Sequence, residues 1–223
     1  MQAQDNPKKT KKAAIILSGC GVLDGSEITE AIAAVFGVCE AGAEPVFFAP
    51  DIPQADVVNH LTGKPEGSRR NVLEEAARIA RGNISDLKNF NAQNLDAAIF
   101  VGGFGAAKNL SDFAANGANC KLNKDAEKAV LDMYNLKKPL GFVCIAPASV
   151  AAPALGKFGV KLTIGSDPQT AAQIEKTGAI HVECAADDFI KDGNVYSTPA
   201  YMLAQSPLDV RCGVAKMARE MLK

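Results

Sequence analysis

Short apolar runs alternate along the chain with segments in which apolar residues recur at a helical period. Residues 13–17, 45–49 and 95–101 are apolar runs bounded by turn residues, the pattern of strands buried on both faces of a parallel sheet. Between the first two runs, residues 27–41 predict a helix. Its apolar face consists of Ile28, Ala31, Ile32, Val35, Val38 and Cys39. This order indicates a right-handed β-α-β unit, so we expect an α/β protein with a mostly parallel central sheet covered by helices.

The remaining chain continues the alternation after an irregular, proline-rich and glycine-rich excursion at residues 50–67. Ser26 and Asn123 are expected to cap the helices that follow them. Asp192 and Gly193 predict the turn of a hairpin. Further helices are expected at residues 70–81, 123–137, 148–155, 168–176 and 208–222, and further strands before Cys144 and at residues 160–164, 179–183, 188–191 and 195–198.

Composition places the chain among ordinary globular proteins. It has 223 residues, of which 48% are hydrophobic and 22% charged, which excludes a disordered or fibrous chain. We expect one domain at residues 13–223, preceded by a flexible tail at residues 1–12 that carries a short lysine cluster. The net charge of −1 gives no electrostatic reason to expect nucleic acid or an anionic membrane as a partner.

No apolar run has the length of a membrane span, and the N-terminus lacks an apolar signal core, so the sequence predicts a cytoplasmic protein without a membrane partner. Its six cysteines lack C-x-x-C spacing. In a reducing compartment this spacing argues for neither disulfides nor a zinc site, and we expect no metal.

Cys144 is the strongest candidate for chemistry. An apolar run led by Gly141 reaches this cysteine, and Ala146 and Pro147 open an alanine-rich helical segment. The cysteine therefore falls where a buried strand turns sharply into a helix, as in a nucleophile elbow, near backbone N–H groups that favour a thiolate. The alternative is a small buried hydrophobic residue, the usual role of a free cysteine.

Two adjacent glycines follow the predicted strand at residues 95–101 and suggest close approach of backbone to a ligand. If that strand neighbours the Cys144 strand, the N–H groups of Gly103 and Ile145 are placed to hold an oxyanion. The glycines also resemble part of a dinucleotide fingerprint, but Lys108 replaces its third glycine and the loop does not follow the first strand. A glycine turn without a ligand is the structural alternative.

Two acidic residues and two further side chains are candidate partners of the thiol. Glu27 and Glu30 lie three residues apart at the start of a predicted helix, and either carboxyl is able to face Cys144 and shuttle its proton. A favourable interaction with the helix dipole explains the same residues without catalysis. His181, with the H-x-E spacing to Glu183, is a candidate base for an amidohydrolase, or else a strand-edge histidine. Cys20, in the loop after the first strand, either lines the same pocket or is an ordinary loop thiol.

Five segments together resemble the ElbB glyoxalase-like proteins of the PfpI and parkinsonism-associated deglycase superfamily, which is similar in fold to class I glutamine amidotransferases. The segments are residues 17–27 (LSGCGVLDGSE), 59–63 (NHLTG), 101–110 (VGGFGAAKNL), 144–147 (CIAP) and 198–202 (TPAYM). The resemblance implies a flavodoxin-like three-layer sandwich, a homodimer and a cysteine nucleophile at Cys144. It favours Glu30 over Glu27 as the acidic partner and assigns Gly103 to the oxyanion hole.

The resemblance also implies a cofactor-independent reaction on small dicarbonyls. We expect a glyoxalase III-type lyase of the hydro-lyase class that converts glyoxal to glycolate without glutathione. The chain departs from many superfamily members because Ile145 stands where they have histidine after the nucleophile, which disfavours a classical triad. A redox-sensing or protein-repair role for the same cysteine and, less favoured, an amidohydrolase remain as alternatives.

Overall fold

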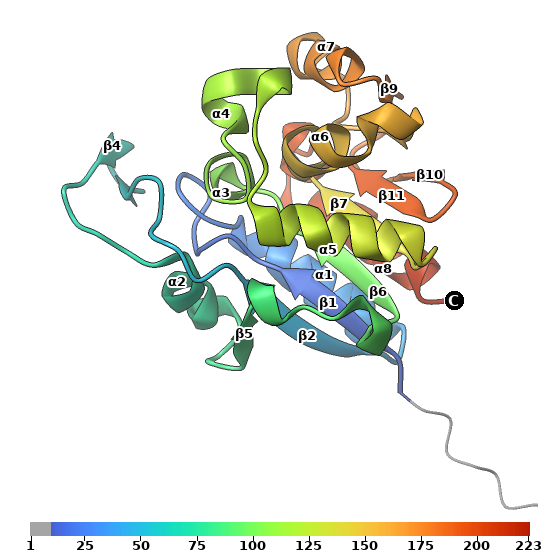
Figure 1. The fold of residues 1–223 in the computed structure, drawn as a ribbon, viewed down its shortest axis with the longest axis horizontal. Coiled ribbons are helices and arrows are strands. Elements are labelled where there is room, and N and C mark those ends of the chain that lie inside the picture. The colour runs from blue at the N-terminus through green and yellow to red at the C-terminus, as the bar shows by residue number, and fades with distance from the viewer. Residues whose placement is uncertain (1–9) are drawn as a thin grey trace, which may run out of the picture.

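The computed structural model describes residues 10–223. The expected flexible tail at residues 1–12 falls mostly outside these residues, and the first strand already begins at Lys12. From that strand to the last helix the described chain forms one α/β body with helices on both faces of a sheet, as Figure 1 shows. The fold predicted from the pattern of apolar residues is therefore confirmed.

The main sheet of the described residues has seven strands in the order β10-β11-β7-β6-β1-β2-β5. Its neighbours pair in parallel except for the antiparallel β10 and β11. The strands are β1 (Lys12–Ile16), β2 (Glu44–Ala49), β5 (Ile84–Asp86), β6 (Ala97–Phe100), β7 (Leu140–Val143), β10 (Ile190–Asp192) and β11 (Val195–Thr198). The chain runs outward from β1 through β2 to β5 and then returns to β6 on the other side of β1. The carboxyl ends of β1 and β6 therefore form the switch point at which open α/β sheets bind ligands.

Four short strands pair outside this sheet. They are β3 (Val58–Asn59) with β4 (Lys64–Pro65), and β8 (Lys161–Leu162) with β9 (Ile180–His181). The first pair belongs to the irregular excursion, which projects to one side of the body in Figure 1. The second pair corresponds to the strands expected at residues 160–164 and 179–183, which are shorter than predicted and lie outside the seven-stranded sheet.

Helices of the two outer layers complete the sandwich. The α-helices are α1 (Ile28–Glu40), α2 (Val72–Ile79), α3 (Phe104–Lys108), α4 (Phe113–Asn116), α5 (Lys124–Asn135), α6 (Ala152–Leu155), α7 (Pro168–Lys176) and α8 (Pro207–Met221). Shorter turns are η1 (Leu87–Asn89), η2 (Ala92–Asn94), η3 (Gly117–Asn119), the π-helical η4 (Pro147–Ala151), η5 (Gly156–Phe158) and η6 (Ala200–Met202). Figure 1 shows α5 in front of the sheet and α1 and α8, which pack together, behind it.

The core is divided between the two faces of the sheet. Ala13, Ile15 and Leu17 join the buried cluster under α1 and α8, whereas Ala14 and Ile16 join the cluster under α5. This alternation follows from the two-residue period of a strand, and burial on both faces explains why β1 reads as an unbroken apolar run.

The apolar face predicted for α1 is only partly buried. Ala31 and Val38 are buried, but Ile28 is 47% and Ile32 36% exposed; Phe36, which was not part of the predicted face, is 49% exposed beside them. The reason is that small residues make the contact with α8: a Cβ on Gly37 would lie 2.7 Å from the Cβ of Ala218. Close approach of the two helices on that side leaves the larger side chains of α1 outside the contact.

The N-cap prediction is right for α5 and wrong for α1. Asn123 accepts hydrogen bonds from the N–H groups of Asp125 and Ala126. In contrast, Ser26 does not cap α1, because its Oγ accepts a hydrogen bond from the N–H of Ser18 at 2.8 Å and Glu27 takes the cap position.

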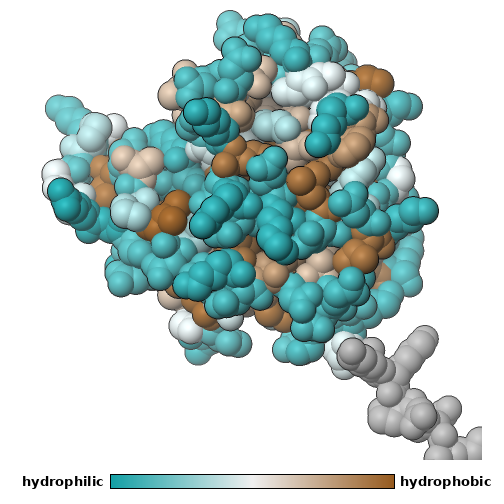
Figure 2. Space-filling model, in the orientation of Figure 1, coloured by the Kyte–Doolittle hydropathy of each residue, from teal (hydrophilic) through white to brown (hydrophobic). Residues whose placement is uncertain are grey.

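The face seen in Figure 2 is mostly hydrophilic, with apolar side chains in small separate groups. Within residues 10–223, no helix is both long and apolar enough to cross a membrane.

Candidate active site

Cys144 sits on a sharp turn directly after β7. Its N–H donates to the carbonyl of Thr198 at 3.0 Å, which continues the pairing of β7 with β11. Its φ of 62° is left-handed, a conformation that costs a residue other than glycine roughly 1 kcal/mol or more. The chain then enters η4, so the strand, strained residue and helix of a nucleophile elbow are all present. The thiol is nearly closed off, since Cys144 is 8% exposed.

Glu30 lies beside this thiol in the first turn of α1. The residue has no exposed surface, and its Oε1 accepts a hydrogen bond from the N–H of Tyr201 at 3.4 Å. Within residues 10–223 its Oε2 has no hydrogen bond of regular geometry, and the Cys144 thiol is the side chain that interacts with this carboxyl. A buried carboxyl with one oxygen left for a thiol is suited to hold or move a proton there.

Gly102 makes the approach of Glu30 and Cys144 possible. A Cβ added at Gly102 would lie 2.4 Å from Cys144 Cβ and 2.5 Å from Glu30 Oε2. Any side chain at this position would therefore occupy the space between the two groups.

The pKa values of the pair are both raised by burial. Desolvation raises the pKa of Glu30 to about 8, and the charge of Glu27 acts in the same direction, while hydrogen bonds from Cys144 and the N–H of Tyr201 oppose it. Burial likewise raises the pKa of the Cys144 thiol, helped by the charge of Glu30. Because Glu30 is mostly protonated at neutral pH, its repulsion of a thiolate is weak there, and the carboxyl is able to donate a hydrogen bond to sulfur.

Two backbone donors favour negative charge at the sulfur. The N–H groups of Gly103 and Ile145 act on the Cys144 thiol and lower its pKa against the effect of burial. Gly103 has a φ of 90°, and a Cβ there would lie 2.4 Å from the carbonyl oxygen of Gly25, so only glycine fits. Both N–H groups named as candidate oxyanion donors therefore act on the Cys144 sulfur.

Glu27 has a different place from Glu30. Its Oε2 accepts a hydrogen bond from the N–H of Glu30 at 2.7 Å, and its own N–H donates to the carbonyl of Gly102 at 3.1 Å. It thus caps α1 and anchors the start of the helix to the glycine pair. Its influence on the chemistry is indirect, through the position and pKa of Glu30.

The structure does not bring Cys20 or His181 into the surroundings of Cys144. The charges that act on the Cys20 thiol come from Glu75, Arg78, Asp24 and Arg70, on the side of the loop that faces α2. His181 lies in β9 and pairs with Leu162 of β8, and its Nε2 accepts a long hydrogen bond from the N–H of Ile164 at 3.5 Å. Its charged neighbours are Glu175 and Glu183.

Asn109 holds together the loops that frame the site. Its side-chain amide donates to the carbonyls of Ser18 at 2.9 Å and Asp24 at 3.0 Å and accepts from the N–H of Ala55 at 2.9 Å. The loops after β1, β2 and β6 thus meet at one buried residue. The roles of Asn109 and Tyr201 were not predicted, and both residues stood out only within motifs of the resemblance. Gly102 belongs to the glycine pair expected to allow close approach of backbone to a ligand, but its place between Glu30 and Cys144 was not predicted.

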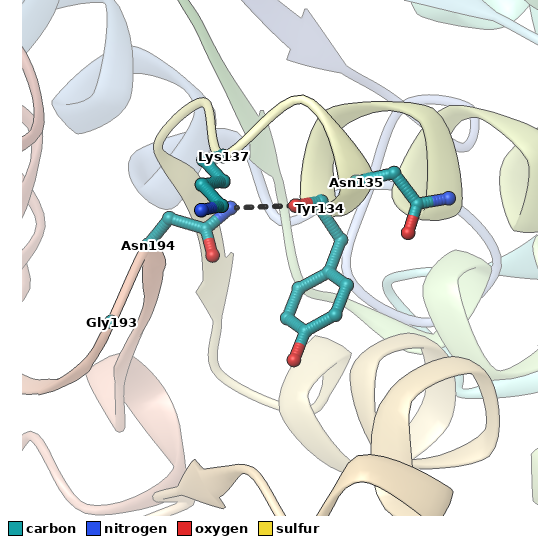
Figure 3. A pocket seen from close by; sticks show the side chains of 5 residues that line it. All are labelled: Tyr134, Asn135, Lys137, Gly193 and Asn194. Carbon is teal, nitrogen blue, oxygen red and sulfur yellow. Dashed lines mark hydrogen bonds between the residues drawn. The ribbon is translucent and has the colours of Figure 1, made fainter.

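A hollow of about 600 Å³ lies elsewhere, between the end of α5 and the β10–β11 turn. Figure 3 shows its lining, in which the side-chain amide of Asn194 donates to the carbonyl of Tyr134 at 3.5 Å. The carbonyl of Asn194 accepts from the N–H of Leu140, at the start of β7, whereas Cys144 follows the end of that strand. The hollow therefore lies at the opposite end of β7 from Cys144, and none of the described cysteines lines it. Residues 10–223 also contain no group of three or more potential metal ligands.

Comparison with known proteins agrees with the fold and the superfamily. No protein-family model matches the chain. It is similar to the human glutamine amidotransferase-like class 1 domain-containing protein 3, mitochondrial, with 44% identity over 97% of this chain and 84% of the relative. It is also similar to the crystal structure of an isoprenoid biosynthesis protein with amidotransferase-like domain from Ehrlichia chaffeensis. That protein is 37% identical, with a TM-score of 0.87 over 94% of this chain and 98% of the other.

Drosophila melanogaster DJ-1beta shares the fold at 18% identity, with a TM-score of 0.54 over 95% of this chain and 90% of the other. The prediction of a cytoplasmic protein is contradicted, because curated relatives from human, rat and zebrafish are named as mitochondrial proteins. The identity and coverage of the human relative decide the family. This chain belongs to the glutamine amidotransferase-like class 1 domain-containing proteins.

Proposed function

We propose that the protein is a glyoxalase-like enzyme, a glyoxalase III-type lyase of the hydro-lyase class, that converts glyoxal-type dicarbonyls to hydroxy acids without glutathione or another cofactor. The observation that carries the proposal is the contact of Cys144 with the buried Glu30 and with two backbone donors. The likeness to the isoprenoid biosynthesis protein also supports placement within the ElbB glyoxalase-like branch.

The first step is addition of the Cys144 sulfur to one aldehyde carbon of glyoxal. The S–C bond forms as the carbonyl π bond breaks, and the N–H groups of Gly103 and Ile145 donate to the oxygen that gains charge. Glu30 gives its proton to this oxygen and takes the proton of the thiol. The product is a hemithioacetal, and the carboxyl is again protonated.

The second step moves a proton between neighbouring carbons. A carboxyl with a pKa of about 8 is ionised in a minority of molecules at neutral pH and is basic enough in that form to accept the proton of the hemithioacetal carbon. When this proton is returned to the adjacent carbon and the hydroxyl proton of the hemithioacetal passes to the neighbouring oxygen, the carbon bonded to sulfur becomes a carbonyl and the intermediate is a thioester of glycolate. Water then attacks the thioester carbon, the S–C bond breaks, and sulfur regains a proton as glycolate leaves. One glyoxal and one water are consumed for each glycolate formed.

The surroundings of the thiol favour a small, neutral substrate. Cys144 is 8% exposed, which limits the size of a reacting group. The charged side chains of the described residues that act on the pair are acidic, so an anionic substrate gains no counterion there. Glyoxal and its close relatives meet both conditions.

The same thiol also suits peroxide sensing or the repair of small adducts, the alternative that the DJ-1beta fold likeness favours. Narrow exposure disfavours bulky protein-bound adducts but admits peroxide. An amidohydrolase is not supported, because His181 is absent from the groups of the described chain that act on Cys144.

We also propose that the protein acts as a homodimer. The support is an exposed apolar stripe on α1 made of Ile28, Ile32 and Phe36, which spans about 12 Å of the helix. The stripe borders a hollow of about 360 Å³ that is also lined by Pro207 and Arg211. A two-fold axis would pack this stripe against its own copy.

The test of the activity compares purified wild-type protein with Cys144→Ala, with glycolate formation from glyoxal followed by nuclear magnetic resonance. The exposed Cys212, replaced by serine, is the matched control because it is a free thiol remote in sequence from the elbow. We expect glycolate from the wild type and Cys212→Ser and none from Cys144→Ala above the uncatalysed rate. Equal rates in wild type and Cys144→Ala would refute the proposal. Rapid oxidation of Cys144 by peroxide together with slow glyoxal turnover would favour the sensing role.

A further inference from the structure

The turn that follows β11 contacts both members of the reactive pair through its backbone. The carbonyl of Thr198 accepts from the N–H of Cys144 at 3.0 Å, and three residues later the N–H of Tyr201 donates to Glu30 Oε1 at 3.4 Å. Cys144 follows β7 and Glu30 lies in α1, so the backbone of this turn links two residues from different elements through one hydrogen bond to each.

A strained residue sets the direction of the Tyr201 N–H. Ala200 has a φ of 44°, which is unfavourable for a residue with a Cβ, and it has no exposed surface. This residue begins η6, whose second residue, Tyr201, contacts Glu30 of α1. The N–H groups at the start of a helical turn have no partner within that turn, which leaves the N–H of Tyr201 free for the carboxyl.

Packing from three directions fixes the turn. Thr198 Oγ1 donates to the carbonyl of Asp188 at 2.7 Å. A Cβ added to Gly213 of α8 would lie 3.0 Å from Thr198 Oγ1. On another side, a Cβ on Gly165 would lie 3.3 Å from Pro199 Cβ and 3.2 Å from Leu203 Cβ. Such close packing keeps a strained conformation in place.

We propose that the turn at residues 198–202 is a positioning element that holds Glu30 against Cys144 through the Tyr201 N–H and the Thr198 carbonyl. With Oε1 tied to Tyr201, Oε2 is the oxygen left to face the thiol. The inference rests on the proposed function only in taking the pair as the reactive centre, and its test does not use glyoxal.

The consequence of this contact is a lower proton affinity of the pair. A hydrogen bond from Tyr201 favours the ionised carboxyl and so opposes the effect of burial on the pKa of Glu30. The other titratable groups that act on Glu30 are Cys144 and Glu27. Loss of the N–H is expected to raise the pH at which the pair loses its first proton by about 0.5 to 1 unit.

The decisive variant replaces the Tyr201 amide by an ester. Native ligation at Cys184 allows residues 184–223 to be synthesised with the α-hydroxy analogue of tyrosine at position 201. The full chain assembled with the ordinary amide is the matched control, and thermal melting checks that both fold. Alkylation of Cys144 is followed against pH by peptide mass spectrometry, which separates this thiol from the exposed Cys39 and Cys212.

We expect the midpoint of Cys144 alkylation to move to higher pH in the ester chain and to stay at the control value in Tyr201→Ala, which keeps the N–H. In a Glu30→Gln background the ester should have no effect on the profile, since the contact acts through the carboxyl. An unchanged midpoint in the ester chain, or an equal shift in Tyr201→Ala, would overturn the proposal.

A second measurement needs no altered chain. In wild-type protein the amide proton resonance of Tyr201 should move with pH at the midpoint found for Cys144 alkylation, and it should not do so in Glu30→Gln. A resonance that stays constant through that midpoint would contradict the contact. Either result is independent of glyoxal turnover, so an inactive enzyme with a titrating Tyr201 amide would reject the proposed function and retain this inference.

Discussion

Gly102 lies so close to Cys144 that a Cβ on the glycine would stand 2.4 Å from the Cβ of the cysteine. The same added atom would stand 2.5 Å from Glu30 Oε2, so the lack of a side chain at Gly102 is what lets the Glu30 carboxyl approach Cys144. The pair therefore depends on a residue that contributes no functional group.

Gly102→Ala is expected to separate the pair. Both neighbouring atoms are held in the buried site, so the added methyl group must displace α1 or the turn at Cys144. This displacement should lower the free energy of unfolding by about 1 to 3 kcal/mol. We expect Cys144 alkylation and glyoxal turnover to change at least tenfold, measured alongside the melting temperature. Gly67→Ala is the control because nothing lies within 4 Å of its added Cβ. Unaltered alkylation in Gly102→Ala would show that the close contact is unimportant.

Burial of Glu30 predicts a loss of stability as pH rises. Its pKa is about 8 in the folded protein and 4.5 for the ordinary group, so between these values the unfolded chain has lost a proton that the folded chain keeps. Unfolding then releases a proton and becomes easier with rising pH, by on the order of 3 kcal/mol between pH 4.5 and 7. Urea unfolding at several pH values measures this dependence. In Glu30→Gln the corresponding slope should disappear; persistence of the full slope would assign it to another group.

Substitutions of Asn109 are expected to lower the stability of the fold, even where the new side chain has almost the same shape. Asn109→Ala removes three hydrogen bonds between the loops after β1, β2 and β6 and should cost about 2 to 4 kcal/mol. Asn109→Asp should cost at least as much, because it places a carboxylate oxygen against the carbonyls of Ser18 and Asp24. Chemical unfolding ranks the variants. An aspartate variant as stable as wild type would contradict the assigned contacts.

The apolar stripe on α1 predicts a solution dimer that one charge disrupts. Ile32→Glu places a carboxylate at the centre of the stripe and should convert dimer to monomer in sedimentation velocity experiments. Leu61→Glu is the control, since Leu61 is 94% exposed in the excursion and lies outside the stripe. A monomeric wild-type protein, or a dimer insensitive to Ile32→Glu, would rule out this interface.

Local sequence signals predicted most elements and the sharp turn that carries Cys144. The helix at residues 168–176 has the predicted bounds, and the Asn123 cap is found. The hairpin predicted to turn at Asp192 and Gly193 is also found, with its turn one residue later at Gly193 and Asn194. Each of these features depends on neighbouring residues only. The elbow at Cys144 belongs to the same class, since a buried strand followed by a helix start is visible in one stretch of sequence.

Features set by tertiary contacts could not be predicted in this way. Glu27 and Glu30 both lie at the start of the predicted helix, and only the position of β7 decides that Glu30 faces the thiol while Glu27 caps α1. Exposure of Ile28 and Ile32 follows from the close packing of Gly37 against α8, a contact between helices far apart in sequence. Cys20 was a candidate because it follows β1, but the loop turns its thiol toward α2.

The left-handed conformation of Cys144 has a consequence for how such a site evolves. Glycine adopts a φ of 62° without a steric penalty, so a glycine at this position would relieve roughly 1 kcal/mol or more of local strain and would remove the thiol. Backbone conformation alone therefore favours glycine here. A cysteine at this position keeps a thiol together with the strain, which is the pattern expected where chemistry rather than local conformation selects the residue.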